Sequence, residues 1–258
     1  MNSILFSIIT VTYNNSKGLV KTVESISQQI GELHEHIVID GDSKDETKRY
    51  LKSLNKDYLN WISEPDKGIY DAMNKGLKLI KGKWVIFMNA GDTFSDKSTL
   101  KKFTEQNFSS DIVYGNCYVE YASGLNRISK PNNIEDLWKG MSFSHQSVFI
   151  KKDIIENNEF DLSYNYCADF NQLFGMYLIG SKFEYWDYLI SNIEAGGISD
   201  AKRYISTNEV YQVNKKLSPK LMNHVYFIPK IFWSFVIVKI KTILPKKVVN
   251  KLTQIKYK

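Results

Sequence analysis

The chain has 258 residues, of which 43% are hydrophobic and 14% aromatic, a composition that excludes a disordered protein. It is long enough for one domain with a full core plus an appendage. Two cysteines, Cys117 and Cys167, are too few for a disulfide framework or a cysteine metal cluster, and they favour a reducing compartment. The apolar N-terminus lacks a basic flank and a small-residue cleavage site, so we interpret it as a buried strand and expect a cytoplasmic protein.

The net charge of +6 is unevenly distributed. From Ala201 onward lie 13 of the 34 basic residues but only one of the 28 acidic residues, Glu209. The first 200 residues keep 21 basic and 27 acidic residues, a net charge of −6, while the tail carries +12. The sequence therefore predicts a mildly acidic domain, 1–200, followed by a basic region, 201–258, rather than a globally basic nucleic-acid-binding protein.

The first part of the chain alternates between apolar runs and segments with helical spacing. Phe6 to Thr12 is a continuous β-branched run, typical of a strand buried on both faces. We expect further strands at 37–39, 59–63 and 84–88, and helices at 18–29, 44–54 and 69–80. This alternation predicts a parallel sheet with helices on its faces.

After residue 92 the alternation is looser. We expect strands at 111–120, 143–150 and 182–192, and an amphipathic helix at 170–179. The glycine pair within 196–199 predicts a flexible flap or a turn.

Three of the predicted strands end in polar residues. These are Tyr13-Asn14, Asp40 and the segment Asn89–Asp92. Ligands of open parallel sheets bind at the carboxyl ends of the strands, so these residues indicate a binding site. Asp40 suits a hydrogen bond to a base or ribose, but no glycine-rich dinucleotide fingerprint accompanies it.

The segment Asn89-Ala90-Gly91-Asp92 has two interpretations. Asp92 can bind Mg²⁺ or Mn²⁺, because these ions are usually held by a carboxylate together with substrate phosphates. Alternatively, the segment is a turn in which Gly91 has a positive φ and Asp92 caps a backbone group.

The segment EPDKGIYDAMNKG, 64–76, places many charges at the start of a predicted helix. Acidic residues at a helix N-terminus can be simple caps. Such an end can also hold a phosphate, and Gly68 permits a close approach to the backbone.

Together, SIITVTYNN, VIDGDSKDET and SEPDKGIYDAMNKGLKLIKGKWVIFMNAGD resemble, in this order and spacing, the family 2 glycosyltransferases with the GT-A fold, over about residues 3–200. The likeness is to small bacterial enzymes of capsule, O-antigen or exopolysaccharide biosynthesis. It implies an α/β GT-A fold with a mostly parallel sheet, and a nucleotide-sugar site lined by Thr12, Tyr13, Asp40, Asp66, Lys67, Gly68, Asn89 and Gly91.

The resemblance also implies that Asp92 is the acid that binds Mn²⁺ or Mg²⁺. The chain departs from the family's paired-aspartate motif, because Asn89 or Ala90 stands where a first acid is often found. Asp71 and Asn74 are interpreted either as pocket residues or as residues of the helix surface.

On the acceptor side, the resemblance places His145 and Gln146 at the pocket. Asp169 matches the segment with the catalytic base, which takes the proton of the acceptor hydroxyl during inverting transfer. Asp169 can also be the N-cap of the helix at 170–179. Asp161 is a weaker alternative for the base.

The basic region contains the apolar stretch Ile231–Val238, which is far shorter than the roughly 20 residues of a membrane-spanning helix. Lysines flank it, which favours a helix lying in the interface of an anionic membrane. A helix packed on the domain and a dimer contact are the alternatives, and the oligomeric state stays open.

The sequence therefore favours an inverting, metal-dependent transferase that moves a hexose or N-acetylhexosamine from a UDP-sugar to a polyprenyl-diphosphate-linked saccharide at the inner face of the cell membrane. A second hypothesis is a non-catalytic nucleotide-fold subunit of a membrane polysaccharide-assembly complex. A third, nucleic-acid binding by the tail, is disfavoured because apolar residues are interleaved with the lysines.

Overall fold

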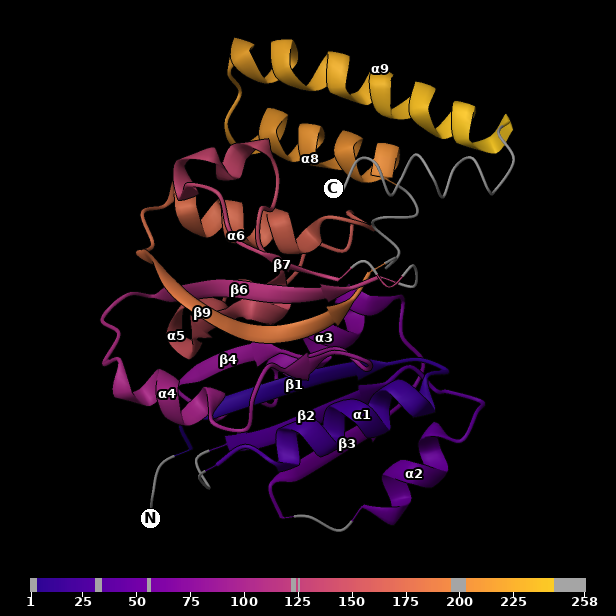
Figure 1. The fold of residues 1–258 in the computed structure, drawn as a ribbon, viewed down its shortest axis with the longest axis vertical. Helices are drawn as coiled ribbons and strands as arrows, with labels where there is room; N and C mark the ends of the chain where they lie inside the picture. Colours follow the sequence, from indigo (N-terminus) through magenta and orange to yellow (C-terminus); the bar gives the residue numbers. More distant parts are fainter. Residues whose placement is uncertain are drawn as a thin grey trace.

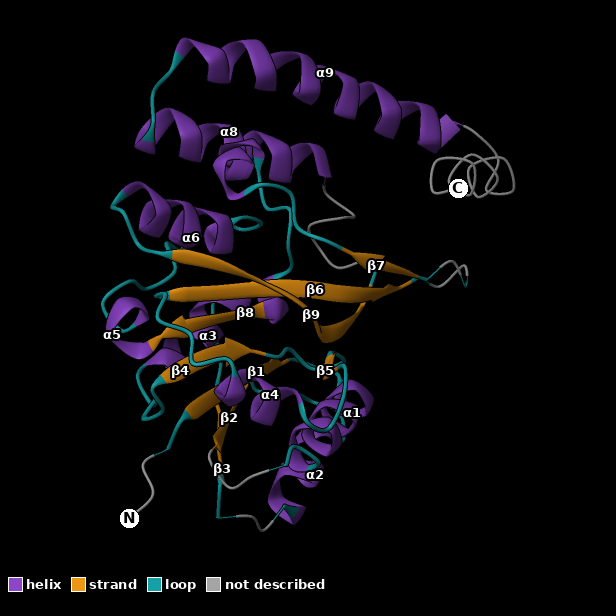
Figure 2. Ribbon diagram, turned by 60° about the vertical axis from the view of Figure 1, so that its left-hand side comes forward, coloured by secondary structure: helices purple, strands orange, loops and turns teal. Residues whose placement is uncertain are grey.

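The computed structural model describes residues 4–30, 34–54, 57–121, 124, 126–195 and 203–243. In this part the chain forms a nine-stranded sheet with helices on its faces and two C-terminal helices stacked beyond it (Figures 1 and 2). The strands are β1 (Phe6–Thr12), β2 (His34–Asp40), β3 (Leu59–Ser63), β4 (Trp84–Phe87), β5 (Thr93–Phe94), β6 (Ile112–Glu120), β7 (Arg127–Ser129), β8 (Val148–Lys151) and β9 (Phe183–Glu194). The helices are α1 (Ser16–Ser27), α2 (Thr47–Ser53), α3 (Ile69–Leu77), α4 (Thr99–Glu105), α5 (Lys152–Ile155), α6 (Ala168–Leu178), α8 (Arg203–Leu217), α9 (Leu221–Ile243) and the short 3₁₀ helices η1 (Ile134–Lys139) and η2 (His145–Ser147).

The strand order is β3-β2-β1-β4-β8-β6-β9-β5, with β7 paired to β6. The four strands β1 to β4 pair in parallel, as the sequence predicts. In the second half, β8 is antiparallel to both β4 and β6, whereas β9 is parallel to β6. The carboxyl ends of β1, β2 and β4 therefore meet at one edge of the sheet, beside the segment that leads into β8.

Several predicted boundaries differ from the structure by two or more residues, and two of these differences bear on the site. The strand predicted at 143–150 begins only at Val148, because the preceding residues form η2, whose Ser147 N–H bonds the carbonyl of Ser144. The helix predicted from Phe170 begins at Ala168, with Cys167 as its N-cap. The predicted flap within 196–199 lies outside the described residues.

Alternating side chains of the central strands bury two separate apolar faces, as the two-residue period of a strand requires. Ile9 and Ile37 belong to the cluster that packs with α3 and α6. Phe6, Ile8 and Trp84 point to the other face and pack with side chains of α1 and α4. Because both faces are covered, the polar residues of these strands gather at their ends.

The helices α8 and α9 pack against the body of the molecule (Figure 1). Val213 of α8 and Phe227 of α9 are fully buried and belong to the same cluster as the side chains of α3 and α6. The basic region is therefore joined to the domain by a shared core over its described residues. Among those residues, no helix has both the length and the apolarity that crossing a membrane requires.

Replacing Phe227 by Ala is expected to lower the free energy of unfolding by about 3 to 5 kcal/mol, because it leaves a cavity where α9 meets the core. Phe232→Ala on the same helix is the matched control, since that side chain is 62% exposed, and it should change stability by less than about 0.5 kcal/mol. Urea unfolding measures both. Equal effects of the two substitutions would show that α9 is not held by this contact.

Candidate active site

The loop that follows β4 is fixed by Thr22 of α1, a residue that sequence reasoning missed. The Thr22 hydroxyl accepts a hydrogen bond from the N–H of Gly91 (2.9 Å) and donates one to the backbone carbonyl of Asp92 (2.7 Å). Gly91 has a φ of 113°, as the turn interpretation predicts. Thr22 sits at an ordinary buried position of an amphipathic helix, so the sequence gives no signal of this role.

Asp92 presents a largely buried carboxylate at this loop. Its residue is 8% exposed, and the side-chain amide of Gln146 donates to its Oδ2 over 2.8 Å. Burial raises the pKa of Asp92 from 3.8 to about 6, although the hydrogen bond from Gln146 opposes the rise. The structure thus brings the predicted metal-binding acid and the predicted acceptor-side glutamine into direct contact.

His145 lies between the two halves of the site. Its Nε2 is 3.3 Å from the side-chain nitrogen of Asn89, and its Nδ1 is 3.5 Å from Oδ2 of Asp169. Its ring and that of Phe87 of β4 form a T-shaped contact. The imidazole therefore connects the end of β4 with the start of α6.

Asp169 occupies the first turn of α6 rather than its N-cap, because the helix begins one residue earlier. Tyr70 of α3 donates its hydroxyl hydrogen bond to Oδ1 over 3.0 Å. Burial alone would raise the pKa of Asp169, but His145 and the backbone N–H of Phe170 outweigh it and lower the pKa below its ordinary value. Asp169 is thus an ionised carboxylate with two side-chain partners, each from a different element.

The segment 64–76 is organised by its own acidic residues. Asp66 accepts the N–H of Gly68 (2.8 Å), and Asp71 accepts the N–H of Lys67 (2.9 Å). Gly68 is the N-cap of α3 with a φ of 118°, and a Cβ built there would meet no atom within 4 Å. The space beside the backbone at Gly68 is therefore open, and its predicted contact with a ligand stays a prediction.

Gly41 joins this segment to the end of β2 and was not singled out from the sequence. A Cβ at Gly41 would lie 2.4 Å from Oδ2 of Asp66 and 3.2 Å from the ring of Tyr13. Three strand-end segments thus meet at one point. Tyr13 is 64% exposed, so its ring is available to a ligand.

Asp40 is completely buried at the end of β2. Its carboxylate accepts hydrogen bonds from the hydroxyls of Ser43 and Ser63, the latter at 2.6 Å. Asp40 therefore fixes the loop after β2 and the end of β3. Its predicted contact with a base or ribose stays a prediction. Thr12, its neighbour on β1, is 7% exposed.

Asn74 lies in the interior, so neither predicted position, pocket or helix surface, describes it. It is 5% exposed, and its amide group donates to the carbonyl of Phe160 and accepts the N–H of the same residue. Asp161, the weaker alternative for the base, accepts hydrogen bonds from Ser163 and Lys216 instead.

The polar cluster at the strand ends comprises Asn89, Asp92, His145, Gln146 and Asp169.

Residues 7–174 match the family model described as Glycosyl transferase family 2. The chain belongs to glycosyl transferase family 2. The helices α8 and α9 lie beyond the matched segment.

Curated relatives cover parts of the chain. An uncharacterized glycosyltransferase of Mycobacterium tuberculosis is 39% identical over 100 residues, which are 38% of this chain and 38% of that protein. A PGL/p-HBAD biosynthesis glycosyltransferase of Mycobacterium bovis is 29% identical over 175 residues, covering 65% of this chain and 67% of that protein. A GalNAc(5)-diNAcBac-PP-undecaprenol beta-1,3-glucosyltransferase of Campylobacter jejuni is 29% identical over 60% of this chain and 54% of its own length. The first of these matches spans about two fifths of the relative's length.

Solved structures of glycosyltransferases share the fold. TarS of S. aureus superposes with a TM-score of 0.62 at 17% identity, covering 88% of this chain and 73% of that chain. A mannosyltransferase of Pyrobaculum calidifontis, solved with GDP-Man and Mn²⁺, gives 0.63 at 16% identity over 82% of this chain and 63% of its own. The predicted GT-A fold is confirmed.

The donor atoms at the end of β4 fit a divalent cation that is shared with a substrate. Among the described residues, no three His, Cys, Asp or Glu side chains gather into a metal site. Asp92 offers a carboxylate, and Oδ1 of Asn89 is buried without a hydrogen-bond partner. Oxygen ligands of this kind, completed by phosphates and water, suit Mg²⁺ or Mn²⁺.

Replacing Asp92 by Asn is expected to raise the free energy of unfolding at pH 7.5 by roughly 1 to 3 kcal/mol, because the amide avoids burying a charge. The raised pKa of about 6 means that the folded wild type resists ionisation. The destabilisation of the wild type by the ionised, buried Asp92 is therefore absent below about pH 4. It grows between about pH 4 and pH 6 and is complete above that range. Urea unfolding at several pH values measures the difference.

Asp96→Asn is the matched control, because hydrogen bonds from Ser98, Tyr188 and Lys102 lower the pKa of that carboxyl despite an opposing effect of burial. Asp96→Asn should have the opposite effect and lower the free energy of unfolding at pH 7.5. A destabilised Asp92→Asn variant at pH 7.5 would contradict the assignment of a desolvated carboxylate to this loop.

Proposed function

We propose that this chain is an inverting glycosyltransferase that moves a hexose or N-acetylhexosamine from a UDP-sugar to a hydroxyl of a lipid-linked saccharide, in the biosynthesis of a capsule, O-antigen or other exopolysaccharide. The proposal rests mainly on the contacts that bring Asp92 and Asp169 to the same site at the carboxyl ends of the strands. Gln146 bonds Asp92, and its neighbour His145 contacts both Asn89 and Asp169. UDP and UDP-GlcNAc complexes of TarS support a UDP-linked donor. The Campylobacter relative, by its name, acts on an undecaprenol-diphosphate saccharide.

In the proposed reaction Asp169 is the base. Inverting transfer needs a carboxylate that takes the proton of the acceptor hydroxyl while the anomeric carbon is attacked. The lowered pKa keeps Asp169 ionised at neutral pH, and Tyr70 and His145 fix the orientation of its two oxygens. Both partners come from elements other than α6, so the carboxylate is positioned before the substrate arrives.

The leaving diphosphate would lie between the loop of Asp92 and the start of α3. The open backbone at Gly68, with Asp66 and Lys67 beside it, suits a phosphate at a helix N-terminus. A divalent cation held by Asp92 and Asn89 would neutralise the charge of the leaving diphosphate. Tyr13 and Asp40 would lie toward the nucleoside.

Asp169→Asn is expected to lower kcat for sugar transfer by about 10² to 10⁴, because general-base catalysis contributes a factor of that size. UDP binding, measured by titration calorimetry with Mn²⁺ and again with EDTA, should equal that of the wild type. Asp161→Asn is the matched control and should keep transfer. Retained transfer in Asp169→Asn would rule out this base, and UDP binding without any transfer by the wild type would favour the non-catalytic subunit.

We also propose that α9 rests on the cytoplasmic face of a membrane. It exposes large apolar side chains around much of its circumference, while Phe227, which faces the core, is buried. The exposed residues are Leu221, Met222, Val225, Ile228, Phe232, Trp233, Phe235 and Ile237. An apolar face rich in aromatics within a basic region matches a helix in the interface of an anionic leaflet.

The double substitution Phe232→Ser and Trp233→Ser is expected to weaken binding to phosphatidylglycerol-containing vesicles at least tenfold, since two exposed aromatic side chains lose their apolar contact. Vesicle co-sedimentation at low and high salt measures the binding. Ile179→Ser, at an exposed apolar residue after α6, is the control. Unchanged binding of the double variant would mean that this face meets something other than the membrane.

A further inference from the structure

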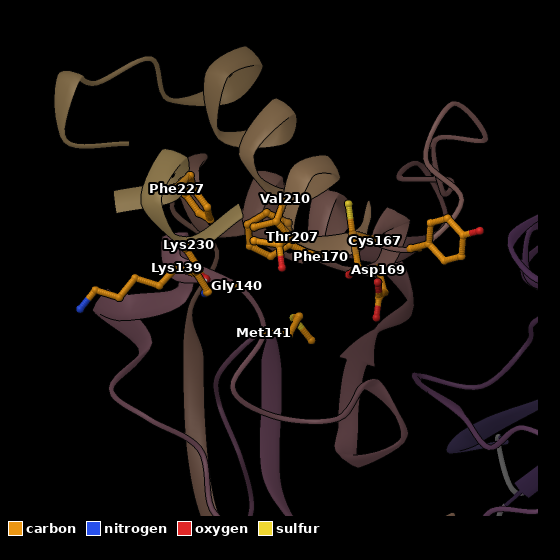
Figure 3. Close-up of a pocket in the computed structure, with 12 residues that line it drawn as sticks. Lys139, Gly140, Met141, Cys167, Asp169, Phe170, Thr207, Val210, Phe227 and Lys230 are labelled. Carbon is orange, nitrogen blue, oxygen red and sulfur yellow. The ribbon is translucent and has the colours of Figure 1, made fainter. Parts of the chain in front are cut away.

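A pocket separate from the strand-end loops lies between α6, η1 and the C-terminal helices. Its volume is about 260 Å³, and Asp169 is part of its lining (Figure 3). Phe170 and Val210 line its middle, together with the hydroxyl-bearing Thr207. The base of the proposed reaction therefore faces a cavity that the tail helices help to build.

The two ends of the pocket differ in charge. Asp169 lies at one end, whereas Lys139 of η1 and Lys230 of α9 lie at the other (Figure 3). Lys139 is paired with Asp136 over 2.6 Å. The Lys230 ammonium contacts only uncharged groups among the described residues, the carbonyl of Lys139 at 3.3 Å and the hydroxyl of Tyr226 at 3.2 Å. Lys230 thus keeps an uncompensated positive charge at the pocket.

The volume limits the ligand. Pockets for drug-sized ligands usually measure about 300 to 1,000 Å³, so a cavity of about 260 Å³ accommodates a single sugar ring better than an oligosaccharide. A sugar whose hydroxyl lies at Asp169 would direct the group on its opposite side toward Lys139 and Lys230. An ammonium group is a strong partner for a phosphate oxygen.

We propose that this pocket binds the accepting sugar, and that Lys230, assisted by Lys139, binds the diphosphate that links this sugar directly to its lipid. This inference rests on the proposed function and adds the size of the acceptor: one sugar on a lipid diphosphate. Lys230 lies on the side of α9 that faces the pocket, whereas Ile228 and Phe232, two residues before and after it, are exposed on another side of the helix. The diphosphate would therefore lie on the pocket side of α9, and the prenyl chain would extend from there to the bilayer.

The proposal fixes a place in a reaction sequence. The acceptor must come from a reaction in which a lipid phosphate attacks a nucleotide sugar, forming the sugar–diphosphate–lipid and releasing a nucleoside monophosphate. The present chain would then add the second sugar. Its product, a disaccharide on the same diphosphate, would fill this site less well than the single sugar and would pass to another transferase.

The test uses the full chain and calorimetric titration of three probes. The first is geranyl-diphosphate-linked N-acetylglucosamine, the second carries a disaccharide on the same diphosphate, and the third is uncharged octyl N-acetylglucosaminide. Lys230→Gln should weaken binding of the first probe about tenfold, the loss expected for one charge-assisted hydrogen bond. Lys230→Arg should restore binding, and Lys220→Gln, at the exposed turn before α9, should match the wild type.

The expected pattern is tighter binding of the first probe than of the other two, with UDP binding equal in all variants. The proposal is overturned if wild type and Lys230→Gln bind the first probe equally well, or if wild type binds the disaccharide probe as tightly as the first. In either case, UDP binding by the wild type would leave the proposed function standing. If the wild type does not bind UDP, the proposed function is contradicted instead. The probe titrations would still show whether the pocket binds a sugar diphosphate.

Discussion

The candidate site depends on the two-sided contact of His145. One ring nitrogen approaches Asn89 at the end of β4, and the other approaches Asp169 at the start of α6. These two elements bind different substrates in the proposed reaction, so a single imidazole sets the separation between donor and acceptor. Gln146 continues the connection to Asp92. A displacement of η2, which bears both residues, would disturb both carboxylates together.

The opposite pKa shifts of the two carboxyl groups follow from their partners. Asp92 is buried with one neutral amide as its side-chain hydrogen-bond partner, and its pKa rises to about 6. Asp169 is partly buried, but a histidine, a tyrosine and a helix N-terminus stabilise its charge, and its pKa falls. Burial destabilises the first carboxylate, and the cation proposed at this loop would relieve that effect. The second is already prepared to interact with a hydroxyl.

The C-terminal helices connect the proposed chemistry to the proposed membrane surface. The inner side of α9 contributes Phe227 to the core and Lys230 to the pocket, while large apolar side chains elsewhere on the helix are exposed. A helix that is apolar outward would be unfavourable in water. Placing it on a lipid surface, as proposed, would remove that cost and would bring a lipid-linked acceptor to the pocket.

The sequence by itself determined the central strands and the polar strand ends, because these follow from local periodicity. Asp92, His145 and Asp169 were predicted as site residues from the resemblance to a family. The tertiary structure decided what those residues touch. Asn74 proved internal because it bonds Phe160, 86 residues away in the chain, and the contact of Gly41 with Asp66 joins two separate loops. The pocket at Asp169 exists only because α8 and α9 pack against α6 and η1. Such contacts depend on the packing of segments that are distant in the sequence, and a local sequence pattern does not predict that packing.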